Sequence, residues 1–263
     1  MNWKPPNALV ARVEDVCLNV WPALQEIHFD GWLIRLADGQ TRRTNSVNIL
    51  HDGLRPADEK IAYCESVYRR HGLPTYFRIL STAGEDMDRL LDQRGYDAQD
   101  ETVTLYMDFA HHAPREPGAA VELTRDTPSR EWLAARARFA GSTPEEILKV
   151  GKILQNLALP AVFAAVRDED GVVRSIAKGA VHDGIVCLNL VATDPAFRRR
   201  GLSRDCLSAI LRWATRECDA SGACLQVVST NASAIALYHG VGFSEELYRY
   251  HYRHRALAAD PFQ

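Results

Sequence analysis

Hydrophobic residues recur along this chain with two different periods, and the period separates predicted helices from predicted strands. Over residues 144–157 the apolar positions have helical spacing, and Thr143, Pro144 and Glu146 form a capping box at the start of this helix. Short runs of apolar and β-branched residues predict strands over 161–166, 172–181 and 185–193. Between the last two, Asp183-Gly184 predicts a tight hairpin turn.

The same periods continue on both sides of this strand meander. They predict a strand around Val121, a helix from Thr127-Pro128 to Ala140, a helix over 203–218, a strand over 223–228, a helix over 234–238 and a strand over 247–252. Helices that alternate with strands in this order are typical of an α/β protein with a mixed sheet. We therefore predict a mixed α/β sheet for the second half.

The first half follows a similar plan. It contains a predicted helix over 8–24, strands over 31–37 and 41–49 joined at Asp38-Gly39, a helix from Asp58 to Gly72, a strand over 75–80, a short helix closed at Gly95 and a strand over 101–109. The stretch FRILST aligns with LQVVST, and LLDQRGY aligns with LYHGVGF. We interpret the halves as an internal duplication. Residues 110–120 hold two prolines and a glycine and predict a linker, giving domains over 1–113 and 119–263.

Composition narrows the class of protein. The 263 residues are 46% hydrophobic and 25% charged, as in soluble globular proteins, and the net charge of -3 argues against nucleic acid as a partner. The longest apolar run, residues 157–166, contains Pro160 and is far shorter than the ~18 residues of a membrane span. The N-terminal residues lack the apolar stretch of a signal peptide. We expect a cytoplasmic protein that does not bind membranes.

Cysteine and histidine spacing predicts no metal site. The six cysteines include no CxxC pair, which favours reduced thiols packed as small hydrophobic residues. The His251-x-x-His254 spacing is better explained by a surface strand than by metal ligands.

The stretch DPAFRRRGLSRDCL, residues 194–207, carries the main chemical signal. Arg198, Arg199 and Arg200 stand side by side between a predicted strand and a predicted helix, and Gly201 follows them. The first N–H groups of a helix lack internal partners and attract anions, and a glycine lets a large anion approach the backbone. We predict a phosphate-bearing ligand here; the alternative is a solvated basic turn.

Two common phosphate motifs do not fit. Gly179 and Gly184 have the spacing of a P-loop, but Ile185 stands where lysine is required. Gly240 and Gly242 follow a helix, whereas a dinucleotide-binding motif follows a strand.

The pattern that does fit is Arg198-x-x-Gly201-x-Ser203, followed in order by Asn231, Ala234, Leu237, Tyr238, Gly242 and Phe243. This pattern resembles the GNAT superfamily of acyl-CoA N-acyltransferases over residues 120–255. Ser203 departs from the family's glycine or alanine. The first half is similar to the N-terminal half of bacterial tandem-GNAT proteins, so the resemblance implies two tandem GNAT-like domains.

The resemblance implies acetyl-CoA (coenzyme A) as the cofactor. Its pyrophosphate would lie on the amides from Arg199 to Ser203, and its pantetheine along a strand that splays from its neighbour at a bulge. The cofactor-binding residues implied are Val191, Ala192, Thr193, Arg198, Arg199, Arg200, Gly201, Leu202, Ser203 and Asn231. Tyr238 would be the general acid that protonates the departing thiolate; its alternative role is that of a core tyrosine. Asn231 either bonds the cofactor or fixes the start of its helix.

An amine would attack the thioester directly in a ternary complex. The identity of the general base stays open. Asn189 stands where some members carry an acidic residue, which favours a water relay. Capping explains Glu145 and Glu146; their alternative role is to line the acceptor site. We expect a small-molecule primary amine or an amino-acid-like acceptor, and a monomer or a homodimer. The alternatives are a longer acyl-CoA, a basic protein tail as acceptor, or a non-catalytic acetyl-CoA-binding sensor.

The N-terminal copy lacks the features that the resemblance assigns to acetyl-CoA. The alignment places Ala83 at the Asn231 position and Leu91 at the Tyr238 position, and residues 49–60 contain no basic loop. We expect this copy to have lost cofactor binding and catalysis, to pack against the other domain and to shape the acceptor site.

Overall fold

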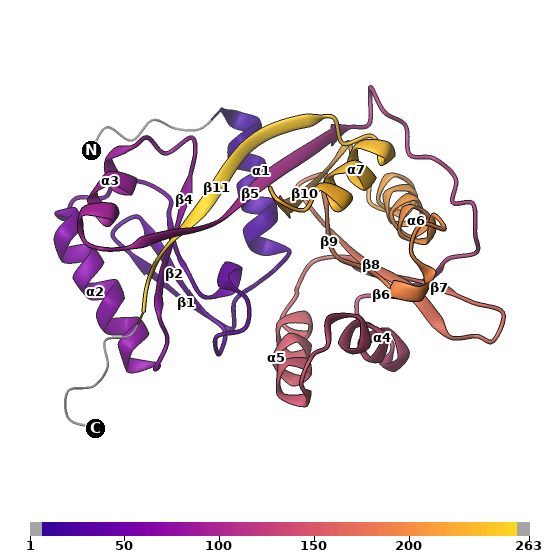
Figure 1. The fold of residues 1–263 in the computed structure, drawn as a ribbon. Helices are drawn as coiled ribbons and strands as arrows, with labels where there is room; N and C mark the ends of the chain where they lie inside the picture. Colours follow the sequence, from indigo (N-terminus) through magenta and orange to yellow (C-terminus); the bar gives the residue numbers. More distant parts are fainter. Residues whose placement is uncertain (1–6, 257–263) are drawn as a thin grey trace. The chain divides into compact units, whose positions relative to one another are not determined.

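The computed structural model describes residues 7–256, which form two compact units in which helices pack on β-strands (Figure 1). Unit 1 contains Ala23–Thr102 and the described residues from Tyr248 onward, whereas unit 2 contains Ala8–Pro22 and Val103–Leu247. The predicted mixed α/β class is confirmed. None of the described helices is long and apolar enough to cross a membrane.

Unit 1 is built on the strand order β1-β2-β3-β4-β11-β5. Its elements are β1 (Gln25–Phe29), β2 (Trp32–Leu36), η1 (Arg42–Thr44), β3 (Val47–Ile49), α2 (Ala57–Arg70), β4 (Thr75–Leu80), α3 (Asp86–Gln93), the first part of β5 (Asp97–Asp108) and the last part of β11 (Glu245–Arg255). Strands β3 and β4 are parallel, and β11 runs antiparallel to β4 with Tyr250 opposite Leu80. The core, which includes Trp32, Tyr68, Phe77 and Leu91, lies between the sheet and helices α2 and α3.

Unit 2 is built on the strand order β5-β10-β9-β8-β7-β6. Its elements are α1 (Ala8–Asn19), β6 (Glu122–Arg125), α4 (Arg130–Ala140), α5 (Pro144–Gln155), β7 (Ala161–Arg167), β8 (Val173–His182), β9 (Ile185–Thr193), η2 (Pro195–Phe197), α6 (Leu202–Glu217), β10 (Gly222–Val228) and α7 (Ala232–Val241). Strands β6 to β9 are antiparallel neighbours, whereas β9 and β10 are parallel. The predicted strands and helices of residues 121–252 are therefore present.

Helices cover both faces of the unit 2 sheet. A large hydrophobic cluster joins α6 and α7 to alternate residues of β7, β8, β9 and β10, among them Leu188 and Leu225. On the opposite face Trp132 of α4 packs edge-to-face on Phe163 of β7, and α1 contacts β8 and β9. In Figure 1, α6 and α7 lie on one side of the strands and α4 and α5 on the other.

The two units repeat one order of elements but exchange their last strands. In unit 1 the order is β3, α2, β4, α3, and in unit 2 it is β9, α6, β10, α7, with a parallel strand pair in each. The next strand after α3 is β5, which lies beside β10, and the next strand after α7 is β11, which pairs with β4. The units therefore do not follow the predicted division at residues 113–119, although residues 110–120 form a loop as predicted.

Three local features differ from the sequence prediction. Helix α1 ends at Asn19 rather than at residue 24, because a residue before proline, here Trp21 before Pro22, is restricted to extended backbone. Strand β1 was not predicted. The predicted strand over 41–49 is the short helix η1 followed by β3, because the Asn45 side chain accepts hydrogen bonds from the amides of Ala37 and Gly39 and holds a turn.

Candidate functional site

The parallel strands β9 and β10 separate half-way along their length. Their residue pairs run from Ile185 with Gly222 to Leu188 with Leu225 and then stop. On its other edge β9 stays paired with β8, but the register shifts, and Leu190 has a left-handed φ of +53°. This conformation is unusual for a leucine and marks a bulge. Residues 190–193 thus keep β8 on one side and no longer pair with β10 on the other, as the resemblance implied.

The basic loop leads from the end of β9 into α6. Asp194 caps η2 by accepting the Ala196 amide, and then the backbone turns through left-handed conformations at Arg199 (φ +63°) and Gly201 (φ +84°). Helix α6 starts at Leu202 without a side-chain cap on its first amides. By contrast, side chains cap helices α4, α5 and α7. An uncapped helix start keeps its N–H donors available to an anion.

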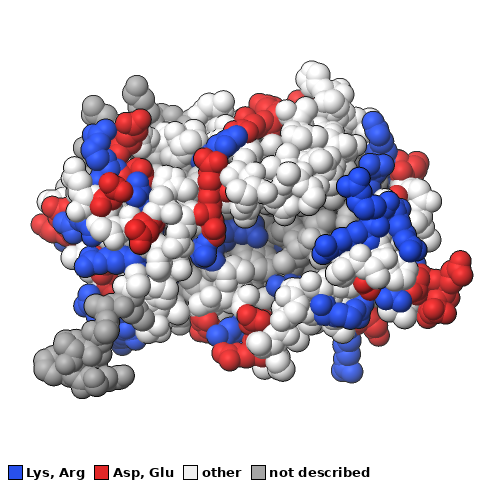
Figure 2. All heavy atoms as spheres, viewed as in Figure 1, with Lys and Arg blue, Asp and Glu red and all other residues white. Residues whose placement is uncertain are grey.

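Positive charge surrounds this helix start. Arg198, Arg199 and Arg200 are all exposed, and within the described residues none of them forms an ion pair with a carboxylate. The Arg200 guanidinium stacks on Phe197, 4.7 Å from the ring centre. Figure 2 shows Lys and Arg atoms gathered over the part of unit 2 that holds η2 and the start of α6. The arrangement attracts a negatively charged ligand.

Arg174 of β8 anchors the first part of the loop. Its guanidinium bonds Asp168 at 2.6 Å and Asp194 at 2.8 Å, and it lies 4.2 Å from the centre of the Phe197 ring. Hydrogen bonds from Arg174 hold the pKa of both carboxyls below their ordinary value. The sequence did not reveal this clamp, because Asp194 lies 20 residues after Arg174, in a separate element.

Ser203 ties the helix start to the end of β9. Its hydroxyl bonds that of Thr193 at 2.6 Å, and Ser175 of β8 bonds Thr193 at 2.8 Å. A glycine or alanine at position 203 has no hydroxyl and could not make the contact with Thr193. The departure from the family pattern is therefore accommodated, since it adds a link between strand and helix.

The space beside Gly201 suits a bulky ligand. A Cβ added at Gly201 would meet no other atom within 4 Å, so the backbone is open on that side. Its φ of +84° is one that residues with side chains rarely adopt. The open backbone, the uncapped amides and the arginines together fit a pyrophosphate group.

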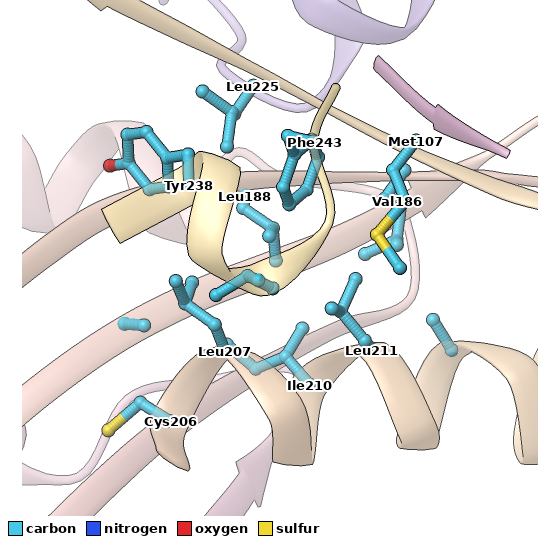
Figure 3. Packing of buried hydrophobic residues seen from close by; sticks show 14 of the residues in the cluster. Met107, Val186, Leu188, Cys206, Leu207, Ile210, Leu211, Leu225, Tyr238 and Phe243 are labelled. Carbon is cyan, nitrogen blue, oxygen red and sulfur yellow. The ribbon is translucent and has the colours of Figure 1, made fainter. Parts of the chain in front are cut away.

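Tyr238 lies on α7, which follows β10, and Asn231 is the residue that caps this helix. Tyr238 is buried and meets Phe243 edge-to-face, with ring centres 6.3 Å apart, in the cluster that contains Leu188 and contacts Val191. Figure 3 shows its hydroxyl oxygen at the edge of this cluster, pointing away from Leu207 and Phe243. The Asn231 Oδ1 accepts the Ala234 amide at 3.1 Å. Asn231 thus fixes the helix start, one of its two predicted roles.

Three residues were considered for the general base or the acceptor site: Asn189, Glu145 and Glu146. The structure explains the two glutamates by contacts within their own helix. Glu146 completes the predicted capping box with Thr143, and Glu145 pairs with Lys149. Asn189 lies at the bulge, is buried, and neither its Oδ1 nor its Nδ2 has a hydrogen-bond partner. A carboxamide does not titrate, so Asn189 cannot serve as a general base.

In unit 1 a carboxylate of the protein occupies the matching loop. The Asp30 side chain accepts the amides of Leu54 and Arg55, at 3.0 and 2.7 Å, just before α2. Those hydrogen bonds, from Arg55 first, lower the pKa of Asp30. Leu91, at the position aligned with Tyr238, is buried in the unit 1 core. This internal anion was missed in the sequence because Asp30 lies 24 residues before Leu54.

All six cysteines are free thiols, in agreement with the sequence prediction. Cys17 of α1, Cys187 of β9 and Cys224 of β10 are buried with their sulfur atoms within 4.8 Å of one another, close enough to share a metal ion. Hydrogen bonds among these thiols, together with burial, raise the pKa of Cys17 and Cys224 well above the ordinary value. In the protonated form these thiols pack as small hydrophobic groups.

Comparisons with known proteins cover nearly the whole chain. The model of a family described as "Probable histone acetyltransferase Rv0428c C-terminal" matches residues 8–255. The uncharacterized N-acetyltransferase YobR of Bacillus subtilis (strain 168) is 24% identical over 246 residues, 93% of this chain and 98% of that protein.

Two solved structures share the fold. A GCN5-related N-acetyltransferase from Kribbella flavida has a TM-score of 0.69 at 15% identity, over 97% of this chain and 98% of that one. A tandem GNAT protein from the clavulanic acid biosynthesis pathway has a TM-score of 0.66 at 12% identity, over 82% of this chain and 76% of that one. The second likeness agrees with the predicted pair of tandem GNAT-like domains.

Proposed function

Because this chain belongs to the family whose model matches residues 8–255, and is thus a GNAT-type N-acetyltransferase, we propose that it acetylates a small primary amine with acetyl-CoA. One observation carries the choice of donor. Helix α6 begins without a cap, behind three exposed arginines, directly after β9 has parted from β10. A ligand with a pyrophosphate at one end and a hydrogen-bonding arm at the other matches that sequence of features.

The donor would be held by backbone more than by side chains. The amides of Gly201, Leu202 and Ser203 would receive the pyrophosphate, with Arg198, Arg199 and Arg200 supplying charge. Backbone groups of Val191, Ala192 and Thr193, which β10 leaves unpaired, would bond the pantetheine arm as an added strand. Asn231 would contribute its remaining amide hydrogens. Acetyl-CoA itself supplies the activated thioester.

Transfer would be direct. The amine nitrogen forms a bond to the thioester carbonyl carbon, the C–S bond breaks, and the sulfur leaves with the bonding pair. Tyr238 would give its hydroxyl proton to that sulfur, and the proton lost by the nitrogen would pass to water because Asn189 cannot accept it. The position of Tyr238, buried by its ring but with its hydroxyl at the cluster edge, supports this role.

Unit 1 would be a scaffold. Its loop amides already bond Asp30, and a second anion would have to displace that carboxylate. We therefore expect one donor site per chain.

Calorimetry with acetyl-CoA tests the proposal. Wild type should bind one equivalent, and Gly201→Glu should weaken binding at least ~10-fold, because it brings a side chain and a negative charge into the phosphate site. Gly141→Glu is the matched control, since Gly141 is also exposed, has a φ of +62° and faces open space, but ends α4. Two sites per chain, or equal loss in both variants, would contradict the assignment.

Turnover with an amine panel separates an enzyme from a sensor. Tyr238→Phe should retain donor binding and lose ~10²–10⁴-fold in kcat, because it removes only the proton donor. Binding without turnover in wild type would favour the sensor, and faster turnover with a longer acyl-CoA would favour a different acyl donor.

A further inference from the structure

Asn189 holds a buried carboxamide that the protein leaves unused. The residue is 7% exposed, and both polar atoms of its side chain lack a hydrogen-bond partner. A buried polar group without partners bears the full cost of losing water, so folding gains nothing from it. An apolar residue of the same shape would make a more stable strand. The asparagine therefore calls for an explanation outside stability.

Its location ties it to the proposed reaction. Asn189 follows Leu188, the last residue of β9 that pairs with β10, and precedes the bulge at Leu190. The segment proposed to hold the donor, Val191 to Thr193, begins two residues further on. Side chains alternate across a strand, so Asn189 faces away from Leu188 and the α6 cluster, toward the face that α1 and α4 cover. The carboxamide thus lies beside the donor segment, on the opposite side from α6.

The neighbouring Lys178 does not fill the same role. Lys178 is directly opposite Asn189 in the β8–β9 pair, and it is fully buried. Its Nζ donates to the Val20 carbonyl at 2.8 Å and so fastens the end of α1 to the sheet. Of this pair, Asn189 is the residue whose hydrogen-bonding groups have no protein partner.

A carboxamide presents one acceptor oxygen and N–H donors side by side. The complementary ligand is a molecule with an N–H donor on one carbon atom and an oxygen acceptor on the adjacent carbon atom. An amine whose carbon is bonded to a carbonyl or carboxylate group has this arrangement. An alkyl amine such as a lysine side chain has no such oxygen and can satisfy only the Oδ1. An α-amine at a peptide N-terminus also has a pKa about 2.5 units below that of a lysine side chain, so more of it is neutral where no base assists.

We infer that Asn189 binds the acceptor and that the acceptor is an α-amino carbonyl compound. The inference rests on the proposed function and names the substrate class of the same site. Oδ1 accepts an N–H of the attacking amine, and Nδ2 donates to the oxygen on the adjacent carbon. Free amino acids and the N-terminal residue of a peptide share this chemistry.

Steady-state kinetics on wild type and Asn189→Leu tests the inference. The acceptors are alanine, alanyl-glycine and propylamine, which separate the free amino acid, the peptide N-terminus and a plain alkyl amine. Wild type should prefer one of the first two over propylamine by at least ~10-fold in kcat/KM. Asn189→Leu should abolish that preference mainly through KM, with the acetyl-CoA Kd unchanged and Tm equal or higher, since an orphaned polar group is replaced by an apolar one of similar size.

Asn48→Leu is the matched control, because Asn48 is equally buried but its amide donates to the Ser46 carbonyl. It should lower Tm and leave the acceptor preference intact. A preference unchanged in Asn189→Leu, a wild-type preference for propylamine, or turnover of other amines with none of these three accepted would overturn the inference alone. Failure of wild type to bind acetyl-CoA would overturn the proposed function as well.

Discussion

Asp30 gives unit 1 an internal counterpart of the anion proposed for unit 2. Its carboxylate accepts two loop amides before α2 and lies near the Lys60 ammonium, with Asp30 Oδ2 3.5 Å from Nζ. These interactions are stronger with the ionised form, which is why the pKa of Asp30 is lowered. One aspartate thus ties a loop, a helix start and a buried lysine together.

The lowered pKa predicts a pH-dependent contribution to stability. The ionised Asp30 stabilises unit 1 above the unfolded-state pKa of about 4, and this contribution is lost as pH falls through the lower folded-state pKa. Asp30→Asn should therefore reduce Tm at pH 7, and the difference from wild type should shrink below about pH 4. Thermal unfolding between pH 3 and 7 measures this, with Asp97→Asn at an exposed position as the control. A difference that does not vary with pH would show that the charge plays no part.

Some single residues of the site could be predicted from the sequence, and others could not. Gly201, Tyr238 and Asn231 were predicted as site residues because the resemblance fixes their spacing. Thr143 was predicted as a helix cap because capping is a local rule, and the structure confirms it. The bulge could not be foreseen, since leucine is a poor residue for the left-handed conformation that Leu190 adopts. The unsatisfied amide of Asn189 likewise depends on tertiary surroundings.

At the level of elements, the loop between β9 and α6 is anchored to the β7–β8 hairpin by side-chain contacts. Arg174 bonds Asp168 in the hairpin turn and Asp194 at the start of the loop, and Phe197 packs on its guanidinium. The loop is thus fixed before a ligand arrives, which reduces the ordering cost of binding.

Arg174→Gln should weaken acetyl-CoA binding by about 10-fold without removing any group proposed to touch the ligand, because the loop loses its anchor. Calorimetry at constant salt measures this. Arg167→Gln is the matched control, since it removes the same charge from the same hairpin at a residue that bonds Glu122 and the Gly171 carbonyl. Equal weakening in both variants would point to general electrostatics rather than to anchoring.

Elements with strong local signals were predicted well, and those that depend on partners were not. Strands β7, β8 and β9 are largely buried and rich in apolar residues, and their turns carry recognisable residues. Strand β1 is mostly polar and exposed, so its sequence QEIHF gave no such signal. The pairing of β11 with β4 joins residues about 170 positions apart, and no local pattern encodes that choice.

At the scale of the whole molecule, the exchange of strands makes the halves interdependent. A fragment of residues 1–113 would lack the part of β11 that pairs with β4, and a fragment of residues 119–263 would lack β5 and the α1 helix that packs on β8 and β9. Each fragment would carry strands that belong to the other unit.

We expect neither fragment alone to unfold cooperatively, and we expect the pair produced together to co-purify and bind acetyl-CoA. Circular dichroism melts and calorimetry on the separate and combined fragments measure this. Acetyl-CoA binding by residues 119–263 alone, with the affinity of the full chain, would show that β5 and α1 are dispensable.

The exchanged strand also sets the order of events during synthesis. A nascent chain leaves the ribosome N-terminus first, so β1 to β4 emerge long before residues 248–255, which complete the edge of β4. Until then that edge presents unpaired backbone groups, the kind of surface on which wrong strands and other chains assemble. The half of the protein that is made first is the half that is finished last.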